Sequence, residues 1–550
     1  MEDGNDTIFE ADSDMFAPLD LFLRMVEENN TVAVDRLLSD WAFRSNLDIN
    51  TCLIACLQRS CDSVIVDKIL KHLPNMRYSD ENGMRALHHA AIHGPVQNVR
   101  CIVEAGVLVN CSDLKGYRPL HYACEHGQTD IVRYLIEEGA HVNSSRTHLS
   151  GESALHIACR CGHVDTVIAL LDSRADINLL ILTEHGGHTP LHKAVMGDSS
   201  EVARVLCQRG ASPYLTDSLG KTALHLAAEM GNIEITRILI QFGDAALVNS
   251  TDELGKTALS YAAHEGFLEV TTDLIQAGAD VSLYDMNGYA PIHLAIAGRK
   301  LDVVELILGS GCDVNMQTHK SLESPLMMAL SVREIDIIQM LLRHGADVNL
   351  PDFKQYTPLH RSQVLGKNEQ LKERITEILL QAGSRVNARD HQGAIPLNRN
   401  IFTSVLINRP CNTGCLKLLV EAGSLLQPDA EYNRNSPLYW LCSSGCLTEA
   451  HYLVQAGWDL RCEPWIMMEG KTPQQNRLHK WFLALSRSVR PLQHYCRNKI
   501  RTRLQELSED REIISSIQLL PVPEKVKQYL CLRDCYFTDD FDASSQVQRS

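Results

Sequence analysis

The sequence is poor in aromatic residues and has no long apolar run. Phe, Trp and Tyr make up 6% of its 550 residues, although hydrophobic residues make up 45%, which is ordinary for a folded chain. No apolar stretch approaches the roughly 18 residues that a membrane-spanning helix needs. The acidic start, MEDGNDTIFEADSD, is unlike a secretory signal. The composition favours closely packed helices in a cytoplasmic or nuclear protein without a membrane segment.

Motifs of metal and catalytic sites are also missing. The 18 cysteines include no Cys-x2-Cys pair, which a RING or other zinc site would need. A spacing such as Cys411-x3-Cys415 puts both thiols on one helix face, which is more typical of a core. Neither a phosphate-binding G-x-x-x-x-G-K-[S/T] loop nor a nucleophile elbow is present. We therefore predict reduced thiols and no catalytic residue, cofactor or metal.

The charge is unevenly distributed. Acidic residues outnumber basic ones 68 to 52, a net charge of −16, so nucleic acid is not an expected partner. Residues 477–536 hold 12 Lys and Arg against 6 Asp and Glu, a net of +6, which leaves −22 for the remainder. This contrast indicates a separate C-terminal module. The acidic remainder favours partners with basic patches, or serves solubility alone.

A tetrapeptide of the form Thr-Pro-Leu-His recurs eleven times. The copies begin at Arg85, Arg118, Ser153, Thr189, Thr222, Thr257, Ala290, Ser324, Thr357, Ile395 and Ser436, and successive copies are 33, 35, 36, 33, 35, 33, 34, 33, 38 and 41 residues apart. Thr or Ser can cap a helix, Pro is tolerated at its first position, and Leu can point into the core. The pattern predicts a helix that begins at each copy.

Each repeat continues in the same way. A set of glycines falls where this first helix must stop, in positions suited to left-handed caps: Gly127, Gly162, Gly231 and Gly266. An apolar second helix follows, such as 131–136, and ends in a turn such as Gly-Ala-Asp-Val-Asn at 345–349. The pattern resembles ankyrin repeats, whose period is about 33. The resemblance implies an all-α solenoid of helix-turn-helix plus β-hairpin units, in which the His bonds the backbone of the neighbouring loop.

Two late steps are longer than the rest. The stretch 365–372 is polar and additional, and we expect it to lengthen the turn between two helices; a second insertion lies near 401–412. Insertions of this kind either project from a binding face or are tolerated loop growth.

The repeat pattern stops after Pro473, and a different segment begins. Four apolar side chains spaced by four residues form one stripe of a predicted helix: Leu492, Cys496, Ile500 and Leu504. Downstream, two prolines at alternate positions force an extended stretch: Leu520, Pro521, Val522 and Pro523. A stripe alone is typical of a helix that packs on its own domain, but the two elements together have a more specific interpretation.

Together they resemble a SOCS box. The resemblance implies that Leu492, Cys496 and Ile500 bind elongin C, and that the Leu-Pro-Val-Pro element at 520–523 selects cullin-5. The connector at 501–519 is longer than is usual in that family. An ankyrin array followed by a SOCS box is similar to the ankyrin repeat and SOCS box (ASB) family over roughly residues 14–535.

The resemblance implies a substrate receptor that binds elongin B/C, cullin-5 with its RING subunit, and an unknown protein substrate. The alternative is a non-catalytic ankyrin scaffold that clusters proteins without ubiquitin transfer. We predict the following organisation: a disordered acidic N-terminus at 1–13, two divergent repeats at 14–80, about eleven repeats and a truncated one at 81–475, a connector at 476–486, a SOCS box at 487–535, and a disordered tail at 536–550.

Two asparagines have a further interpretation. Asn143 and Asn349 lie at the hairpin position, each eight residues after a leucine. In this context they resemble substrates of the asparaginyl hydroxylase that also acts on hypoxia-inducible factor. The alternative is that each asparagine only supports its turn.

Overall fold

The computed structural model describes residues 18–40, 48–72, 74–144, 151–182, 184, 186–366, 368–406, 411–426 and 436–458, with residues 480, 500, 501, 504, 517, 518 and 527 of the C-terminal segment. These residues form helices joined by turns. No β-strand is present among them, and the hairpin loops contribute one isolated antiparallel bridge, between Thr216 and Thr222. The predicted all-α fold is confirmed, with loops in place of stranded hairpins.

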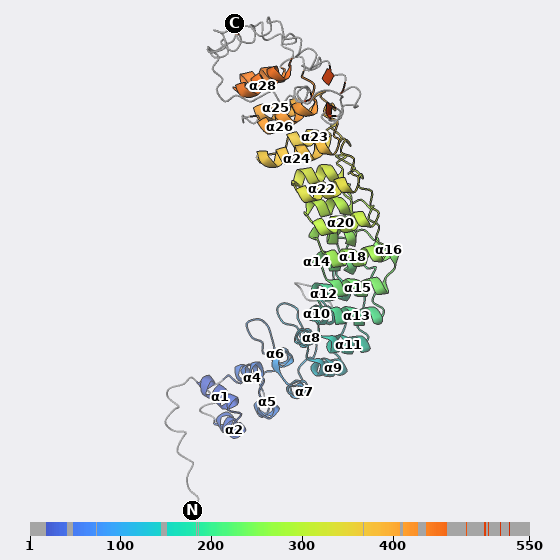
Figure 1. The fold of residues 1–550 in the computed structure, drawn as a ribbon. Helices are drawn as coiled ribbons and strands as arrows, with labels where there is room; N and C mark the ends of the chain where they lie inside the picture. Colours follow the sequence, from blue (N-terminus) through green and yellow to red (C-terminus); the bar gives the residue numbers. More distant parts are fainter. Residues whose placement is uncertain are drawn as a thin grey trace, which may run out of the picture. The chain divides into compact units, whose positions relative to one another are not determined.

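The described residues fall into two compact units. Most of their helices are labelled in Figure 1. Unit 1 comprises residues 1–262 and 267–280, and unit 2 comprises residues 263–266 and 281–550. The helices of unit 1 are α1 (Pro18–Glu27), α2 (Thr31–Ser39), α4 (Ile49–Gln58), α5 (Ser63–Leu70), α6 (Ala86–His93), α7 (Val96–Glu104), α8 (Pro119–Glu125), α9 (Thr129–Glu137), α10 (Ala154–Cys161), α11 (Val164–Asp172), α12 (Pro190–Met196), α13 (Ser200–Gln208), α14 (Ala223–Met230), α15 (Ile233–Phe242), α16 (Ala245–Val248) and α18 (Leu268–Gln276). Helix α17 (Ala258–Glu265) spans the division.

The helices of unit 2 are α19 (Pro291–Ala297), α20 (Leu301–Gly309), α21 (Pro325–Val332), α22 (Ile335–Arg343), α23 (Pro358–Gln363), α24 (Glu369–Gln381), α25 (Pro396–Leu406), α26 (Thr413–Ala422), α27 (Pro437–Ser443) and α28 (Leu447–Ala456). Single residues of the C-terminal segment are also helical, among them Ile500 and Arg501.

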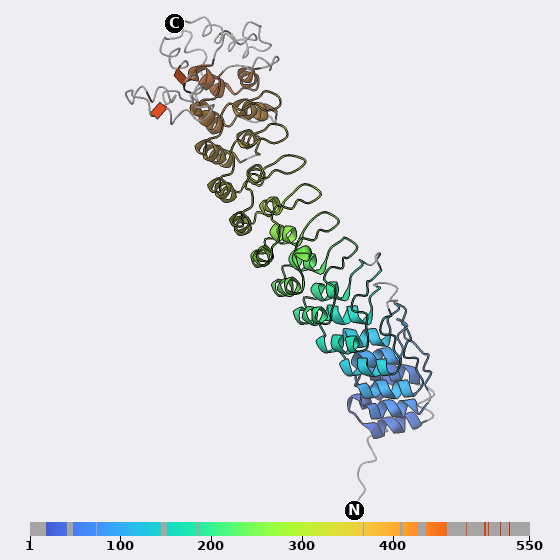
Figure 2. The same ribbon diagram turned by 90° about the vertical axis from the view of Figure 1, so that its right-hand side faces the viewer.

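Each unit is a stack of helix pairs. In unit 1 the first helices of successive repeats, such as α8, α10 and α12, contact one another, and so do the second helices α9, α11 and α13. Unit 2 repeats this arrangement with α21, α23 and α25 in one layer. The loops of unit 2 project from one side of its helix pairs (Figure 2). Each repeat therefore buries its apolar surface against its neighbours.

The first helices begin and end as the tetrapeptide predicts. At α12 the Thr189 hydroxyl caps the helix by accepting the His192 N–H, and Pro190 occupies the first position. Leu191 is buried in the core. Helix α14 stops at Gly231, whose φ of 74° lies in the left-handed region, and a Cβ there would lie 2.6 Å from the Phe267 ring. Both backbone angle and space thus favour glycine.

The second helices are held by one apolar face. In α9, Ile131, Val132 and Leu135 are buried, whereas Arg133 and Glu137 are exposed. Burial of each aliphatic side chain contributes about 1.5–3 kcal/mol. This contribution offsets the low stability of a short isolated helix.

The late insertions lengthen helices as well as turns. Five residues separate α23 from α24, against two between α21 and α22, so the first half of 365–372 does extend the turn as predicted. The prediction that 365–372 extends a turn is wrong for its second half, because Asn368 caps α24 and the helix begins at Glu369. Helix α24 has 13 residues, against 9 in α22. Helix α25 has 11 residues, whereas α12, which begins at an equivalent copy of the tetrapeptide, has 7. Glu369 and Lys372 favour helix and extend α24 by about a turn.

Helix pairs also precede the first strong copy of the tetrapeptide. Helices α1 and α2 contact each other, as do α4 and α5. Asp48 caps α4 by accepting N–H groups from Asn50 and Thr51. That these pairs are divergent ankyrin repeats, and that the segments have the limits given above, stay predictions.

Candidate functional site

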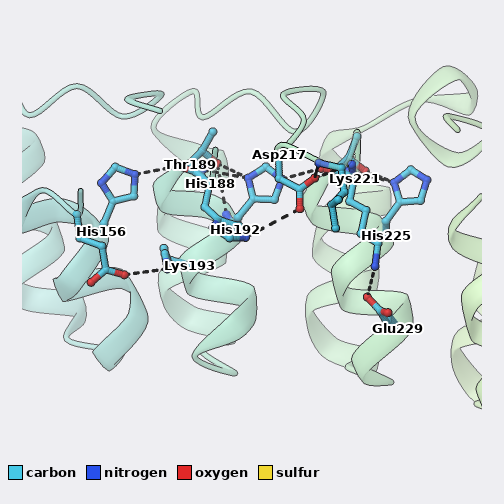
Figure 3. A network of polar contacts seen from close by, with 12 residues as sticks. His156, His188, Thr189, His192, Lys193, Asp217, Lys221, His225 and Glu229 are labelled. Atoms are coloured by element: carbon cyan, nitrogen blue, oxygen red, sulfur yellow. Dashed lines mark hydrogen bonds and ion pairs between the residues drawn. The ribbon is translucent and has the colours of Figure 1, made fainter. Parts of the chain in front are cut away.

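At six copies of the tetrapeptide the histidine bonds the loop of the following repeat, and Figure 3 shows examples in unit 1. The Thr189 N–H donates to Nδ1 of His192 over 3.2 Å, so Nε2 carries the proton and donates to the Lys221 carbonyl oxygen at 3.0 Å. The same contact to the following loop is made at five other repeats: His88 to Tyr117, His121 to Ser144, His156 to His188, His225 to Lys256, and His360 to Ala394. The role that the ankyrin resemblance implied for the histidine is confirmed at these positions.

Burial keeps these histidines neutral. Desolvation lowers the pKa of His88, His121, His156 and His192 to about 4, because a buried imidazolium loses its hydration. Hydrogen bonds to loop carbonyls oppose the shift but are weaker. At neutral pH the rings therefore serve as fixed donors to the neighbouring loop.

In most repeats an aspartate organises the loop tip by accepting backbone N–H groups, as at Asp113, Asp217 and Asp285. The Asp113 carboxylate accepts the N–H groups of Lys115 at 2.9 Å and Tyr117 at 2.7 Å. Tips also bond one another, as when the Glu253 N–H donates to the Leu219 carbonyl over 3.1 Å. Side chains at the tips are thus presented on a fixed backbone.

These tips carry exposed apolar side chains, which we name the tip row. In unit 1 the tip row consists of Leu114, Leu182, Leu219 and Leu254, and in unit 2 of Met286, Leu322 and Phe353. Leu114 is 73% exposed and Met286 is 71% exposed. Within unit 1, Leu219 and Leu254 stand on tips that bond each other, and neighbouring exposed apolar side chains are typical of protein contact sites. The sequence analysis missed this row. A signal for five of its seven members is an apolar residue one or two positions after the loop aspartate, as at Asp285-Met286 and Asp217-Ser218-Leu219.

Charged side chains lie along the first helices of unit 1. Lys193 Nζ is 2.8 Å from the buried Glu152 carboxylate, and Lys221 Nζ is 2.6 Å from Glu229 (Figure 3). Lys221 Nζ also lies 4.4 Å from the centre of the Tyr261 ring, a cation–π arrangement. This face is therefore polar and ordered, and the Lys193–Glu152 ion pair and the Lys221–Tyr261 contact each bridge successive repeats.

A small hollow opens between α25 and α27 in unit 2. Asn398, Phe402 and Trp440 line it, and the two rings meet edge to face with centres 6.1 Å apart. Asn398 occupies the histidine position of the tetrapeptide, and its Oδ1 is buried without a hydrogen-bond partner. The hollow therefore offers an amide acceptor beside an aromatic wall.

Of the predicted elongin C contacts, Ile500 is described. It is helical and 39% exposed, so part of its side chain is accessible to a partner. Leu492 and Cys496 lie outside the described residues, and so do Leu520, Pro521, Val522 and Pro523. Their roles stay predictions.

The two candidate asparagines bridge repeats. The Asn143 amide donates to the Arg174 carbonyl over 3.4 Å and accepts the Asp176 N–H at 2.8 Å. The Asn349 amide makes the equivalent pair with Gly383 and Arg385 at 3.3 and 2.7 Å. Each side chain therefore supports its turn; whether it is also hydroxylated stays a prediction.

The described cysteines are free thiols. Burial raises the pKa of Cys111 and Cys207 to about 11, so both are protonated at neutral pH. In the described part of the chain no group of three or more His, Cys, Asp or Glu side chains could hold a metal ion. None of the helices that the structure describes is long and apolar enough to cross a bilayer.

Comparisons with known proteins agree with the repeat pattern. A family model for ankyrin repeats in three copies matches residues 52–146, 106–180, 144–217, 211–285, 244–318 and 292–390. A family model for the SOCS box matches residues 488–531. Comparison with the curated proteins finds no match.

Solved structures similar to the chain include two ankyrin repeat domains. One is that of human ASB11, at 26% identity and a TM-score of 0.38, covering 42% of this chain and 98% of that one. The other is that of Bcl-3, described as a unique member of the IkappaB protein family, at 25% identity and a TM-score of 0.35, covering 38% of this chain and 93% of that one.

The two family models together decide the family. Ankyrin models cover more than half of the chain, and the SOCS box model follows them in the segment where the repeat pattern has stopped. The SOCS box is an elongin B/C-binding module. The chain belongs to the ankyrin-repeat proteins that carry a C-terminal SOCS box, the ankyrin repeat and SOCS box family.

Proposed function

We propose that this chain is the substrate-recognition adaptor of a cullin-RING ubiquitin ligase. Its ankyrin repeats bind a target protein, and its SOCS box recruits elongin B/C and cullin-5 with its RING subunit, so that the target is ubiquitinated and degraded. The observation that carries the proposal is the domain order, with ankyrin repeats at 52–390 and a SOCS box at 488–531. The chain then acts by holding proteins in the cytoplasm or nucleus, and the transfer chemistry belongs to its partners.

On the ligase side, Leu492, Cys496 and Ile500 form the face that enters a groove of elongin C. Each buried aliphatic side chain in such a groove contributes about 1.5–3 kcal/mol, in the helix-in-groove mode of recognition. The helical, partly exposed Ile500 supports this assignment. The extended element Leu520–Pro523 contacts cullin-5.

On the target side, the tip row and the first helices supply the contact surface. Exposed Leu219 and Leu254 stand on neighbouring tips that bond each other, so the apolar surface is ordered before binding. Preorganisation of this kind lowers the entropy that a partner must lose. Residues 1–280 hold 39 acidic and 21 basic residues, which favours a target with a basic region around its apolar contact.

The second candidate is a scaffold that clusters proteins without ubiquitin transfer. It shares the ankyrin surface but has no need of elongin B/C. The two functions are therefore separated by what co-purifies with the full chain.

The test is a pair of substitutions in the predicted elongin face. The double variant Leu492→Ala with Cys496→Ala removes two of three apolar contacts, so we expect elongin B/C affinity to fall by at least about 100-fold. Co-purification and calorimetry measure the loss. The variant Gln493→Ala with His494→Ala changes the two intervening polar positions of the same segment and should retain elongin B/C.

Retention of elongin B/C by the Leu492/Cys496 variant would contradict the proposal and favour the scaffold. Where binding is lost, the same variant serves as a trap. Proteins that accumulate on it, and on the wild-type chain only when the proteasome is inhibited, are the targets.

A further inference from the structure

One side chain of the C-terminal segment reaches the ankyrin stack of unit 2. Arg501 Nη2 donates to the Val420 carbonyl oxygen over 2.6 Å and lies 3.4 Å from the Glu421 carbonyl oxygen. These carbonyls belong to the last turn of α26, about 80 residues earlier in the chain. The contact therefore joins the SOCS box region to the later ankyrin repeats.

The end of α26 is a site that favours a cation. The last carbonyls of a helix lack intrahelical donors and form the negative end of its dipole. Gly423 closes the helix in a left-handed conformation, with its N–H directed at Leu419 and Val420. The Arg501 guanidinium supplies a charged donor at this end, and charge-assisted hydrogen bonds are about twice as strong as neutral ones.

Burial makes the position of Arg501 specific. The residue is 7% exposed, and a buried guanidinium is tolerated only where its hydrogen bonds are made. The neighbouring Ile500 is 39% exposed. Because successive helical residues differ by about 100° in direction, one helix can face α26 with Arg501 and leave Ile500 open to a partner.

We propose that Arg501 is a positioning residue, which locks the SOCS box onto the C-terminal end of α26 and fixes its direction relative to the later repeats. The purpose of the lock rests on the proposed function, because an adaptor that holds target and ligase at a fixed separation raises their effective concentration. The lock itself is a property of this chain alone.

The experiment measures the distance between the two modules in the full chain. Lys417 on α26 has a half-exposed side chain and Gln518 of the C-terminal segment is exposed, so fluorophores are attached there through unnatural amino acids. Single-molecule energy transfer in the wild-type chain should give one narrow population. In Arg501→Ala this population should be lost to a broad distribution, while elongin B/C affinity stays unchanged.

Two further variants keep the test interpretable. Arg374→Ala removes an exposed arginine of α24 that pairs with Glu377 of the same helix over 2.7 Å, and it should leave the narrow population intact. Arg501→Lys retains the charge but not the guanidinium fork, so its distance distribution should be broader than in the wild type and narrower than in Arg501→Ala. It replaces Arg501→Ala in the test if that variant does not fold.

A narrow population in Arg501→Ala, or a broad one in the wild type, would overturn the lock. So would loss of elongin B/C from Arg501→Ala alone, since Arg501 would then belong to the elongin surface. Both labels lie on this chain. A wild type that does not bind elongin B/C would therefore contradict the proposed function without deciding the distance measurement.

Discussion

The two units are built from the same repeat, but the histidine of the tetrapeptide recurs more regularly in unit 1 than in unit 2. In unit 1 the first five copies carry the histidine, at His88, His121, His156, His192 and His225, and the sixth has Ser260. In unit 2 the same position holds Met327, Asn398 and Tyr439 beside two histidines, His293 and His360. Residues 1–280 carry a net charge of −18, whereas residues 281–550, with 29 acidic and 31 basic residues, carry +2. The comparison indicates that regular bridges stabilise unit 1, and that unit 2 requires other contacts.

Unit 2 has such contacts in its interior. The Asn400 amide donates to Gln363 Oε1 over 2.8 Å, and Gln363 Nε2 donates to Thr376 Oγ1 over 3.1 Å. All three residues are fully buried and come from α25, α23 and α24. A buried network of satisfied polar groups specifies one arrangement of these lengthened helices.

The largest expected difference between the units is their response to acid. A lowered histidine pKa means that the folded state binds fewer protons than the unfolded state, so stability is complete above pH 6.5 and is lost as pH falls toward 4. Unit 1 contains four such histidines with a pKa of about 4, at positions 88, 121, 156 and 192, and unit 2 contains His293. Each shift corresponds to at most about 3 kcal/mol.

Hydrogen exchange of the full chain between pH 7 and pH 4.5, corrected for intrinsic rates, measures this loss in each unit separately. We expect amides of α8 to α13 to lose protection before those of α20 to α24. Equal loss in both units would mean that the histidine bridges do not control acid stability.

A smaller effect is expected from single substitutions at the tetrapeptide. His192→Ala leaves the Thr189 N–H and the Lys221 carbonyl without their partner, which should lower the free energy of unfolding by about 2–4 kcal/mol. Asn398→Ala removes an acceptor that is already unpartnered, so its effect should stay within about 1 kcal/mol. Urea unfolding of both variants measures the two changes in the free energy of unfolding. A larger loss of stability in Asn398→Ala than in His192→Ala would contradict the stabilising role of the histidine bridge.

The regular part of the fold follows from the sequence because its causes are local. The caps at Thr189 and Gly231 and the apolar face of α9 depend on residues within one repeat, so the tetrapeptide and its spacing predict them. The family resemblance added the histidine bridge, which spans two repeats. These two sources, the local pattern and the family resemblance, were enough to predict most of the fold of unit 1.

In unit 2 several features of the fold depend on contacts between residues far apart in the chain, which a single sequence does not indicate. The polar stretch 365–372 was interpreted as a turn, but only its first half is one. Its second half caps and begins α24, whose Thr376 contacts Gln363 of another helix. Arg501 lies off the predicted apolar stripe and would ordinarily be solvated, yet it reaches α26. Both contacts depend on the tertiary arrangement rather than on periodicity.

The smallest expected effect is hydroxylation, which can be compared between the units because each contains one candidate. We expect the peptides with Asn143 and Asn349 to gain the mass of one oxygen atom when the full chain is incubated with the asparaginyl hydroxylase and its co-substrates. Asn249 is the matched control, since its amide makes the same bridge, to Gly278 and Asp280 at 3.1 and 2.8 Å, but the residue eight positions before it is Gln241. Because the added hydroxyl leaves the bridging amide in place, stability should change by less than about 0.5 kcal/mol. Mass spectrometry that finds Asn249 modified as readily as the other two would show that the preceding leucine does not determine the choice, and unmodified Asn143 and Asn349 would leave both with their structural role alone.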